Sequence, residues 1–155
     1  MARAAYIVFS QSGSIDEATN GISFFNVIEG VEGSTPIEGE KVPPGTSLGL
    51  KARLVATWMK EEGDTPDVKY EGEIICTSPK GTPIFAGEFP AFSFAENIHF
   101  QRITIKELYM PGFPEMGMYI IEARLRREGQ TDWIARQTYP FHIRMANEAP
   151  SDPAS

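Results

Sequence analysis

The sequence predicts an all-β fold, namely a two-sheet antiparallel β-sandwich of about seven to eight strands. Segments in which apolar and polar residues alternate with period two recur along the chain, and clusters of glycine, proline and polar residues separate them at near-regular spacing. We find no segment of useful length with helical periodicity. Because each one-sided strand needs an apolar layer to cover it, two packed sheets are the natural arrangement.

The clearest pattern lies in the last third of the chain, at residues 116–145. Between 119 and 126, apolar residues on one face alternate with Glu122 and arginines on the other, as in a half-buried strand. A polar cluster at 127–132 then turns the chain, and a second β-rich run begins at Trp133. This segment predicts a long antiparallel hairpin, in which Pro140 indicates an edge or a bulge.

Six more strands are expected earlier in the chain. Their ranges are residues 4–10, 22–31, 48–58, 68–77, 84–89 and 98–108. Alternation is sharpest in the third of these, where Trp58 shares the phase of the apolar residues, and the apolar phase changes within the sixth. The connections include loops at 11–20 and 32–46 and an acidic turn at 60–67.

Length and charge limit the class of protein. A chain of 155 residues is long enough for one domain, which we expect at 1–146, followed by a disordered C-terminal tail at 147–155. The net charge of −7 makes the protein acidic and argues against nucleic acid or an anionic membrane as a partner. The acidic groups concentrate in the first two thirds, and residues 98–146 carry a small net positive charge.

Cysteine use and hydropathy point to a cytoplasmic protein. The single cysteine, Cys76, excludes an intramolecular disulfide and a multi-cysteine zinc site, and its phase on a strand predicts a small buried hydrophobe. No apolar run approaches the roughly 18 residues of a membrane span. The apolar run at residues 4–9 is too short for a signal peptide.

Motifs of known chemistry are absent from the sequence. There is no nucleophile elbow, no glycine-rich phosphate loop and no metal-binding histidine pair. The two histidines, His99 and His142, each lie on an expected strand rather than in a loop. We therefore expect no enzyme activity, no cofactor and no metal, and a small hydrolase is the least favoured alternative.

Two resemblances refine the expected fold. The Gly117-x-Tyr119 entry to a strand near the C-terminus resembles the tyrosine corner of immunoglobulin-like domains. The segments at residues 5–9, 22–28 and 78–81 resemble those of an uncharacterised bacterial family of small β-sandwich proteins, immunoglobulin-like or C2-like in fold. This second resemblance spans most of the chain and implies no catalytic residues.

The first candidate binding surface is the outward side of the terminal hairpin. Arginine has a planar, multidentate side chain that suits carboxylates and phosphates, so such a face fits an acidic partner or the acidic part of the protein itself. The alternative is cross-strand pairing with Glu122, Glu128 and Asp132. The arginines concerned are Arg124, Arg126, Arg136 and Arg144, with Arg102 on a flanking strand.

The second candidate surface is the connection at residues 109–116, which is unusually apolar. Exposed methionine and aromatic side chains at a loop tip often mark a protein-binding patch, although the loop could equally fold back as a lid on the sandwich. Its candidate residues are Tyr109, Met110, Phe113 and Met116. The Phe-rich segment at 89–94 is expected to pack over the core instead.

The expected function is a non-enzymatic protein-interaction module, an adaptor or a subunit of a larger assembly, with a protein partner or self-association. The main alternative is a ligand-binding sandwich. Trp133 could stack on a carbohydrate, and acidic loops that meet at one end of the sandwich, with Asp64 among them, could hold calcium. A solvated acidic rim is the simpler interpretation of those loops.

Overall fold

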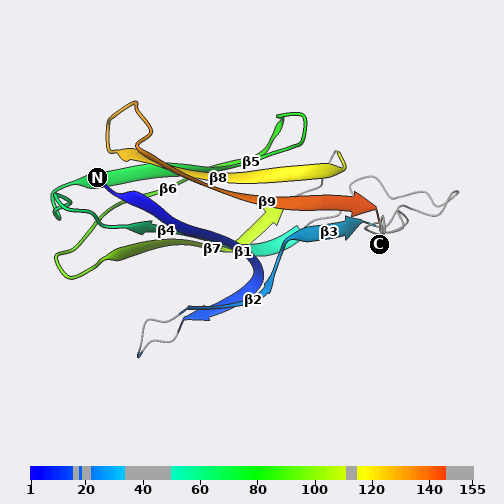
Figure 1. Cartoon of the computed structure of the whole chain (residues 1–155), viewed down its shortest axis with the longest axis horizontal. Helices are drawn as coiled ribbons and strands as arrows, with labels where there is room; N and C mark the ends of the chain where they lie inside the picture. The colour runs from blue at the N-terminus through cyan, green and yellow to red at the C-terminus, as the bar shows by residue number, and fades with distance from the viewer. Residues whose placement is uncertain (16–17, 19–21, 34–49, 111–114, 146–155) are drawn as a thin grey trace, which may run out of the picture.

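A computed structural model of the chain describes residues 1–15, 18, 22–33, 50–110 and 115–145. These residues form nine strands and no helix, arranged in two layers (Figure 1). The expected tail at 147–155, most of the loop at 32–46 and Phe113 lie outside the described residues. The strands are β1 (Arg3–Ile15), β2 (Ile22–Val27), β3 (Gly30–Gly33), β4 (Leu50–Met59), β5 (Lys69–Thr77), β6 (Pro83–Ser93), β7 (Phe100–Met110), β8 (Gly117–Arg127) and β9 (Ala135–Met145).

The two sheets confirm the predicted β-sandwich. One sheet has four strands in the order β2-β1-β4-β7, and the other has five in the order β3-β9-β8-β5-β6. All neighbours pair antiparallel except β3 and β9, which are parallel. The predicted terminal hairpin is confirmed as β8 and β9, which lie at the centre of the larger sheet.

None of the described residues belongs to a helix that would be long and apolar enough to cross a lipid bilayer.

The core lies between the two sheets and is rich in aromatic side chains. Phe9 of β1 contacts two rings of β9 in the opposite sheet, with ring centroids 5.2 Å from Phe141 and 6.2 Å from Tyr139. Trp58 and Cys76 are fully buried, as their phases predict. Aromatic pairs of this kind stabilise a core by about 0.5–1.5 kcal/mol beyond the area that they bury.

The predicted second strand, residues 22–31, is wrong as a single strand, because the chain changes sheets within it. Ile28 donates its backbone N–H to the Phe9 carbonyl in the four-stranded sheet, at 2.8 Å. The carbonyl of the following residue, Glu29, accepts from the His142 N–H in the five-stranded sheet, at 2.9 Å. Ile28 and Glu29 thus connect the end of β2 in one sheet to the start of β3 in the other. Strong β propensity marks both parts alike, so it does not reveal the switch.

Two more strands are longer than predicted. β1 continues to Ile15 through residues expected to form a loop, because Ser12 and Gly13 pair with β2. β6 continues to Ser93, past Pro90. Proline lacks a backbone donor and is tolerated on edge strands, and β6 is the edge of its sheet. The aromatic residues of the segment at 89–94 pack on the core, as expected.

Pro140 also lies where a missing donor costs little. It is paired with Ile120 of β8. His142, two residues later, directs its N–H away from β8 to the Glu29 carbonyl just before β3. Alternate residues of a strand direct their N–H groups to the same side, so the Pro140 nitrogen also points toward the β3 side of β9. At Pro140 this side is unpaired, because β3 pairs with β9 only from His142 onward. β9 is not an edge strand and its register with β8 has no bulge at Pro140, so the expected edge is found only as this stretch of β9 that β3 does not reach.

Tyr119 makes the hydrogen bonds expected of a tyrosine corner. Its hydroxyl donates to the Glu115 carbonyl at 2.8 Å and accepts from the Glu115 N–H at 3.1 Å. The ring is buried and stacks on Phe141, with centroids 5.6 Å apart. This arrangement fixes the chain where it enters β8.

At the opposite end of the sandwich, Asp64 is not part of a solvated acidic rim. Its side chain is only 1% exposed and accepts a hydrogen bond from the Tyr70 hydroxyl. It also accepts from the Glu61 N–H at 2.9 Å and lies 3.7 Å from the amino group of Met1. The expectation that Asp64 is solvated is therefore wrong, because a core tyrosine supplies a buried donor for its carboxylate.

Candidate interaction face

The outer face of the five-stranded sheet carries an ionic patch built by two neighbouring strands. The inward residues of β5 and β8 are buried, so the residues between them point outward. Strand register places Glu73 directly opposite Arg124 and Glu71 directly opposite Arg126. We define the ionic patch as Glu71, Glu73, Arg124 and Arg126. Two acidic residues on one strand thus face two basic residues on the next.

Each arginine of the ionic patch is paired with the glutamate across from it. Arg126 Nε donates to Glu71 Oε1 at 2.8 Å, and Arg124 donates to Glu73 through Nε and a terminal nitrogen. Arg124 also lies 3.8 Å from Glu122. The sequence also allowed that these arginines pair with acidic residues across strands, and the structure shows such pairs. Of the three acidic partners expected, only Glu122 is found beside Arg124, and the cross-strand partners are Glu71 and Glu73.

Trp133 covers the two arginines of the ionic patch. The guanidinium carbons of Arg124 and Arg126 lie 4.4 Å and 4.7 Å from the centroid of the indole. Such cation–π contacts favour a flat arginine over a lysine and hold the ring beside the sheet. Trp133, which the sequence offered as a stacking platform for sugar, therefore already stacks on the protein's own side chains.

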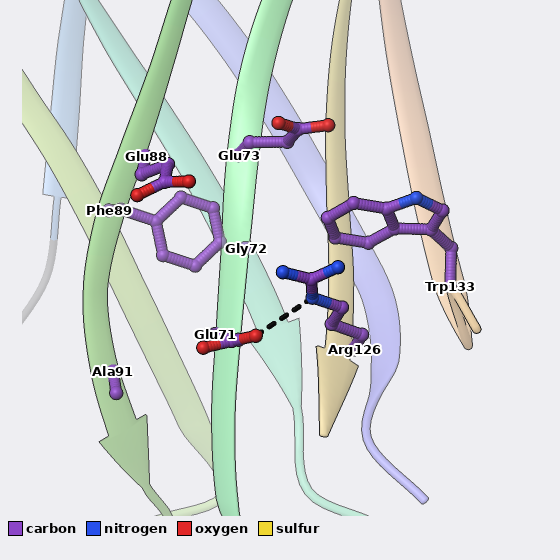
Figure 2. A pocket seen from close by; sticks show the side chains of 8 residues that line it. All are labelled: Glu71, Gly72, Glu73, Glu88, Phe89, Ala91, Arg126 and Trp133. Atoms are coloured by element: carbon purple, nitrogen blue, oxygen red, sulfur yellow. Dashed lines mark hydrogen bonds and ion pairs between the residues drawn. The ribbon is translucent and has the colours of Figure 1, made fainter. Parts of the chain in front are cut away.

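A pocket of about 240 Å³ lies beside Trp133 on the same face (Figure 2). Its walls come from β5, β6 and β8. The Phe89 ring lies against Gly72, where the absence of a Cβ leaves room for it. The carboxylate of Glu88, exposed on the edge strand β6, makes no ion pair with any residue that the structure describes. The lining residues are Glu71, Gly72, Glu73, Glu88, Phe89, Ala91, Arg126 and Trp133.

The other half of this outer face carries exposed apolar residues on β8, next to the exposed His142 and Arg144 of β9. Met118 and Ile120 follow each other on the outward side of β8 and are 48% and 45% exposed. Met116, just before the strand, is 44% exposed. Pro140, exposed on β9, lies beside Ile120. We call Met116, Met118, Ile120 and Pro140 the apolar row. It continues the ionic patch along β8.

The structure brings only some of the predicted site residues together. Arg124 and Arg126 form the ionic patch, Arg136 is exposed on β9 opposite Arg124, and Arg144 is exposed nearer the far end of β9. Met116 belongs to the apolar row. Tyr109 and Met110 were expected in a loop with it, but they end β7 in the other sheet. Arg102, on the same strand as Tyr109, also belongs to that sheet.

Groups of metal-binding type do not converge in the described part of the chain. No three residues there from among histidine, cysteine, aspartate and glutamate are grouped so that they could hold a metal ion. His99 and His142 are exposed, and neither lines the pocket. Burial raises the pKa of the Cys76 thiol to about 11, so the nucleophilic thiolate is disfavoured at neutral pH.

No model of a known protein family matches the chain, and no curated protein is significantly similar to it in sequence.

Proposed function

We propose that the chain is a non-enzymatic protein-interaction module, an adaptor or a subunit of a larger assembly, that acts through the outer face of its five-stranded sheet. The observation that carries this proposal is the apolar row. Three consecutive outward positions along one strand entry, Met116, Met118 and Ile120, are each close to half exposed. An outer sheet face that meets only water is usually polar, and contiguous exposed apolar groups beside charged ones are typical of interaction sites.

The ionic patch supports the same surface. Its arginines are held in place by glutamates and by Trp133, so their side-chain entropy is already reduced before any partner arrives. Tryptophan and arginine are the residue types most enriched at the centres of protein interfaces. A partner would therefore meet an ordered surface that carries both the apolar row and the ionic patch.

We also propose that the sandwich is immunoglobulin-like. The order β9-β8-β5-β6 in one sheet and the adjacent β4 and β7 in the other fit the arrangement of strands G, F, C and C′ opposite B and E in that fold. Tyr119 on β8, the counterpart of strand F, makes hydrogen bonds like those of a tyrosine corner. Membership of a bacterial family of such sandwiches is a proposal that rests on the three sequence segments given above.

The test compares two isoleucines with nearly equal exposure. Ile120→Glu places a charge in the apolar row, and Ile98→Glu places the same charge at a residue that is 43% exposed in the connection between β6 and β7. Affinity-tagged wild type and both variants would be incubated with lysate of the source cells, and bound proteins quantified by mass spectrometry. We expect a specific partner, or untagged copies of the same chain, to be lost with Ile120→Glu and kept with Ile98→Glu.

Equal recovery with both folded variants would show that the apolar row is not the interaction surface. Recovery of no protein at all by the wild type would count against an interaction module of any kind.

A further inference from the structure

We propose that the partner of this face is a second copy of the same chain, docked face to face about a two-fold axis that runs parallel to the strands between β5 and β8. This inference rests on the proposed function and names its partner. It follows from the positions of charge and shape on this face, because the ionic patch, Trp133 and part of the apolar row each have a counterpart on the same face, at the same level along the strands.

Charge gives the first match. A two-fold axis between β5 and β8 lays β8 of one copy over β5 of the other and preserves the level along the strands. Because Arg124 is directly opposite Glu73 and Arg126 opposite Glu71, each arginine of one copy would then lie over the equivalent glutamate of the other. The ionic patch is therefore self-complementary about this axis. An axis perpendicular to the strands at the level of Glu122, the middle residue of β8, would instead lay Ile120 over Arg124 and Met118 over Arg126.

Shape gives the second match. Trp133 stacks on Arg124 and Arg126, so it is raised above β8 at their level. The pocket lies at the same level and is lined mainly by β5 and β6, with Arg126 and Trp133 of the same copy at its side (Figure 2). The proposed axis exchanges these two regions. The indole of each copy would therefore enter the pocket of the other, beside Glu88, whose carboxylate has no ion-pair partner among the described residues of its own copy.

The apolar row gives the third match. Strand pairing aligns Pro140, Ile120, Thr77 and Pro83 across β9, β8, β5 and β6. About the same axis, Ile120 would lie over Thr77 of the second copy, and Pro140 over Pro83. These contacts would remove apolar surface from water beyond the ion pairs.

The face is large enough for a specific dimer. About this axis β9 and β8 of one copy lie over β6 and β5 of the other, so four strands overlap. Four strands about 4.8 Å apart and an eleven-residue β8 with a rise of about 3.4 Å per residue give an overlap of roughly 19 Å by 37 Å. A stable interface takes about 600–1,000 Å² from each partner. Most of the outer face would therefore be covered, as in the aligned packing of two sheets.

The decisive experiment uses two charge-reversed variants of the full chain. The acidic variant carries Arg124→Glu and Arg126→Glu, and the basic variant carries Glu71→Arg and Glu73→Arg. Both lose the pairs within one copy, so only pairs between copies can be restored when they are mixed. Sedimentation equilibrium at low salt would measure the dimer dissociation constant of each protein alone and of the equimolar mixture, after circular dichroism has shown that each is folded.

We expect a wild-type dimer, a dissociation constant at least tenfold higher for each variant alone, and recovery of the dimer in the mixture. A matched control, Arg3→Glu with Lys106→Glu, changes net charge as much as the acidic variant does, at exposed sites in the four-stranded sheet, and should dimerise like the wild type. If a charge-reversed variant does not fold, Trp133→Ala tests the same axis, and we expect it to weaken the dimer at least tenfold.

A wild type that stays monomeric at millimolar concentration would overturn the proposal. An equimolar mixture that does not recover the dimer would also overturn it. Where Trp133→Ala replaces the mixture, an unchanged dimer dissociation constant would do the same. A monomer whose captured partner of another sequence is lost with Ile120→Glu would overturn the self-pairing while the interaction module stands. A monomer that captures nothing would overturn both.

Discussion

Two buried tyrosines hold the opposite ends of the five-stranded sheet, and they find their partners in different ways. Tyr119, at the start of β8, bonds to the backbone of Glu115, four residues earlier. Tyr70, near the start of β5, donates to the carboxylate of Asp64 and accepts from the N–H of Ala2, at 3.3 Å. Ala2 directly precedes β1. One hydroxyl closes a local turn, and the other ties three separate segments together.

The difference teaches what each hydroxyl contributes. Burial raises the pKa of both tyrosines, and the bond to Asp64 raises that of Tyr70 further, so both hydroxyls stay protonated and can donate. The acceptor of Tyr119 is a neutral carbonyl in a partly exposed turn. The acceptor of Tyr70 is a carboxylate that is almost completely buried. A buried carboxylate that loses its donor destabilises the fold far more than a carbonyl near the surface, because water can hydrogen-bond to that carbonyl instead.

The largest effect is expected from Tyr70→Phe. The change removes a hydrogen bond to a buried carboxylate, so we expect the free energy of unfolding to fall by about 3 kcal/mol, as for loss of a charged buried partner. Urea denaturation at pH 7 would measure it. Asp64→Asn in the same background is the control: the two changes should be strongly non-additive, and additive losses would mean that the pair is not coupled.

An intermediate effect on stability is expected from pH, through the buried thiol of Cys76 on β5. The pKa of the Cys76 thiol is 9.0 in its ordinary state and about 11 in the fold. Between these values the folded state binds more protons than the unfolded state, so stability falls as pH rises. The contribution of the protonated thiol to the free energy of unfolding is fully present below pH 9, and about 2–3 kcal/mol of it is lost by pH 11.

The measurement is urea denaturation under reducing conditions at pH 8, 9, 10 and 11, for wild type and Cys76→Ala. Tyrosine ionisation affects both proteins, so the difference between the two curves reports the cysteine. We expect the wild type to lose stability more steeply above pH 9. Parallel curves would mean that the thiol ionises in the folded protein as easily as in the unfolded chain.

The smallest effect is expected from Tyr119→Phe. The phenyl ring keeps its contact with Phe141, and the two hydrogen bonds to Glu115 are lost. We expect a loss of about 1 kcal/mol, since neutral hydrogen bonds near solvent contribute about that much. Thermal unfolding of this variant beside Tyr70→Phe would rank the two ends directly. A larger loss for Tyr119→Phe would reverse the comparison.

Local patterns predicted the strands but not how they meet. The alternation in β4, β5 and β8 follows directly from side-chain period, and Gly117 with Tyr119 marks a turn whose hydrogen bonds are local. The sheet switch at Ile28 and Glu29 depends on the carbonyl of Phe9 and the N–H of His142, which are distant in sequence. No local pattern encodes a partner that far away.

The candidate site shows the same limit. The period along one strand identified Arg124 and Arg126 as outward, and the sequence offered Met116 and Trp133 as exposed candidates in a loop and at a turn. It could not identify Glu71 and Glu73 as their partners, since that requires β5 to neighbour β8. Asp64 was misread for the same reason, because the burial of a loop carboxylate depends on a tyrosine from the next strand.

The parallel pairing of β3 with β9 also constrains the order in which the protein can be completed during synthesis. In the described structure, Gly30–Gly33 pairs only with the last strand, and Tyr139 of that strand donates to the Ile28 carbonyl at 2.7 Å. The early strands β1 and β4 can meet as soon as both have left the ribosome. The backbone of β3 must wait, unpaired, until residue 145 has emerged, so nascent chains truncated before β9 would carry an open edge that invites aggregation.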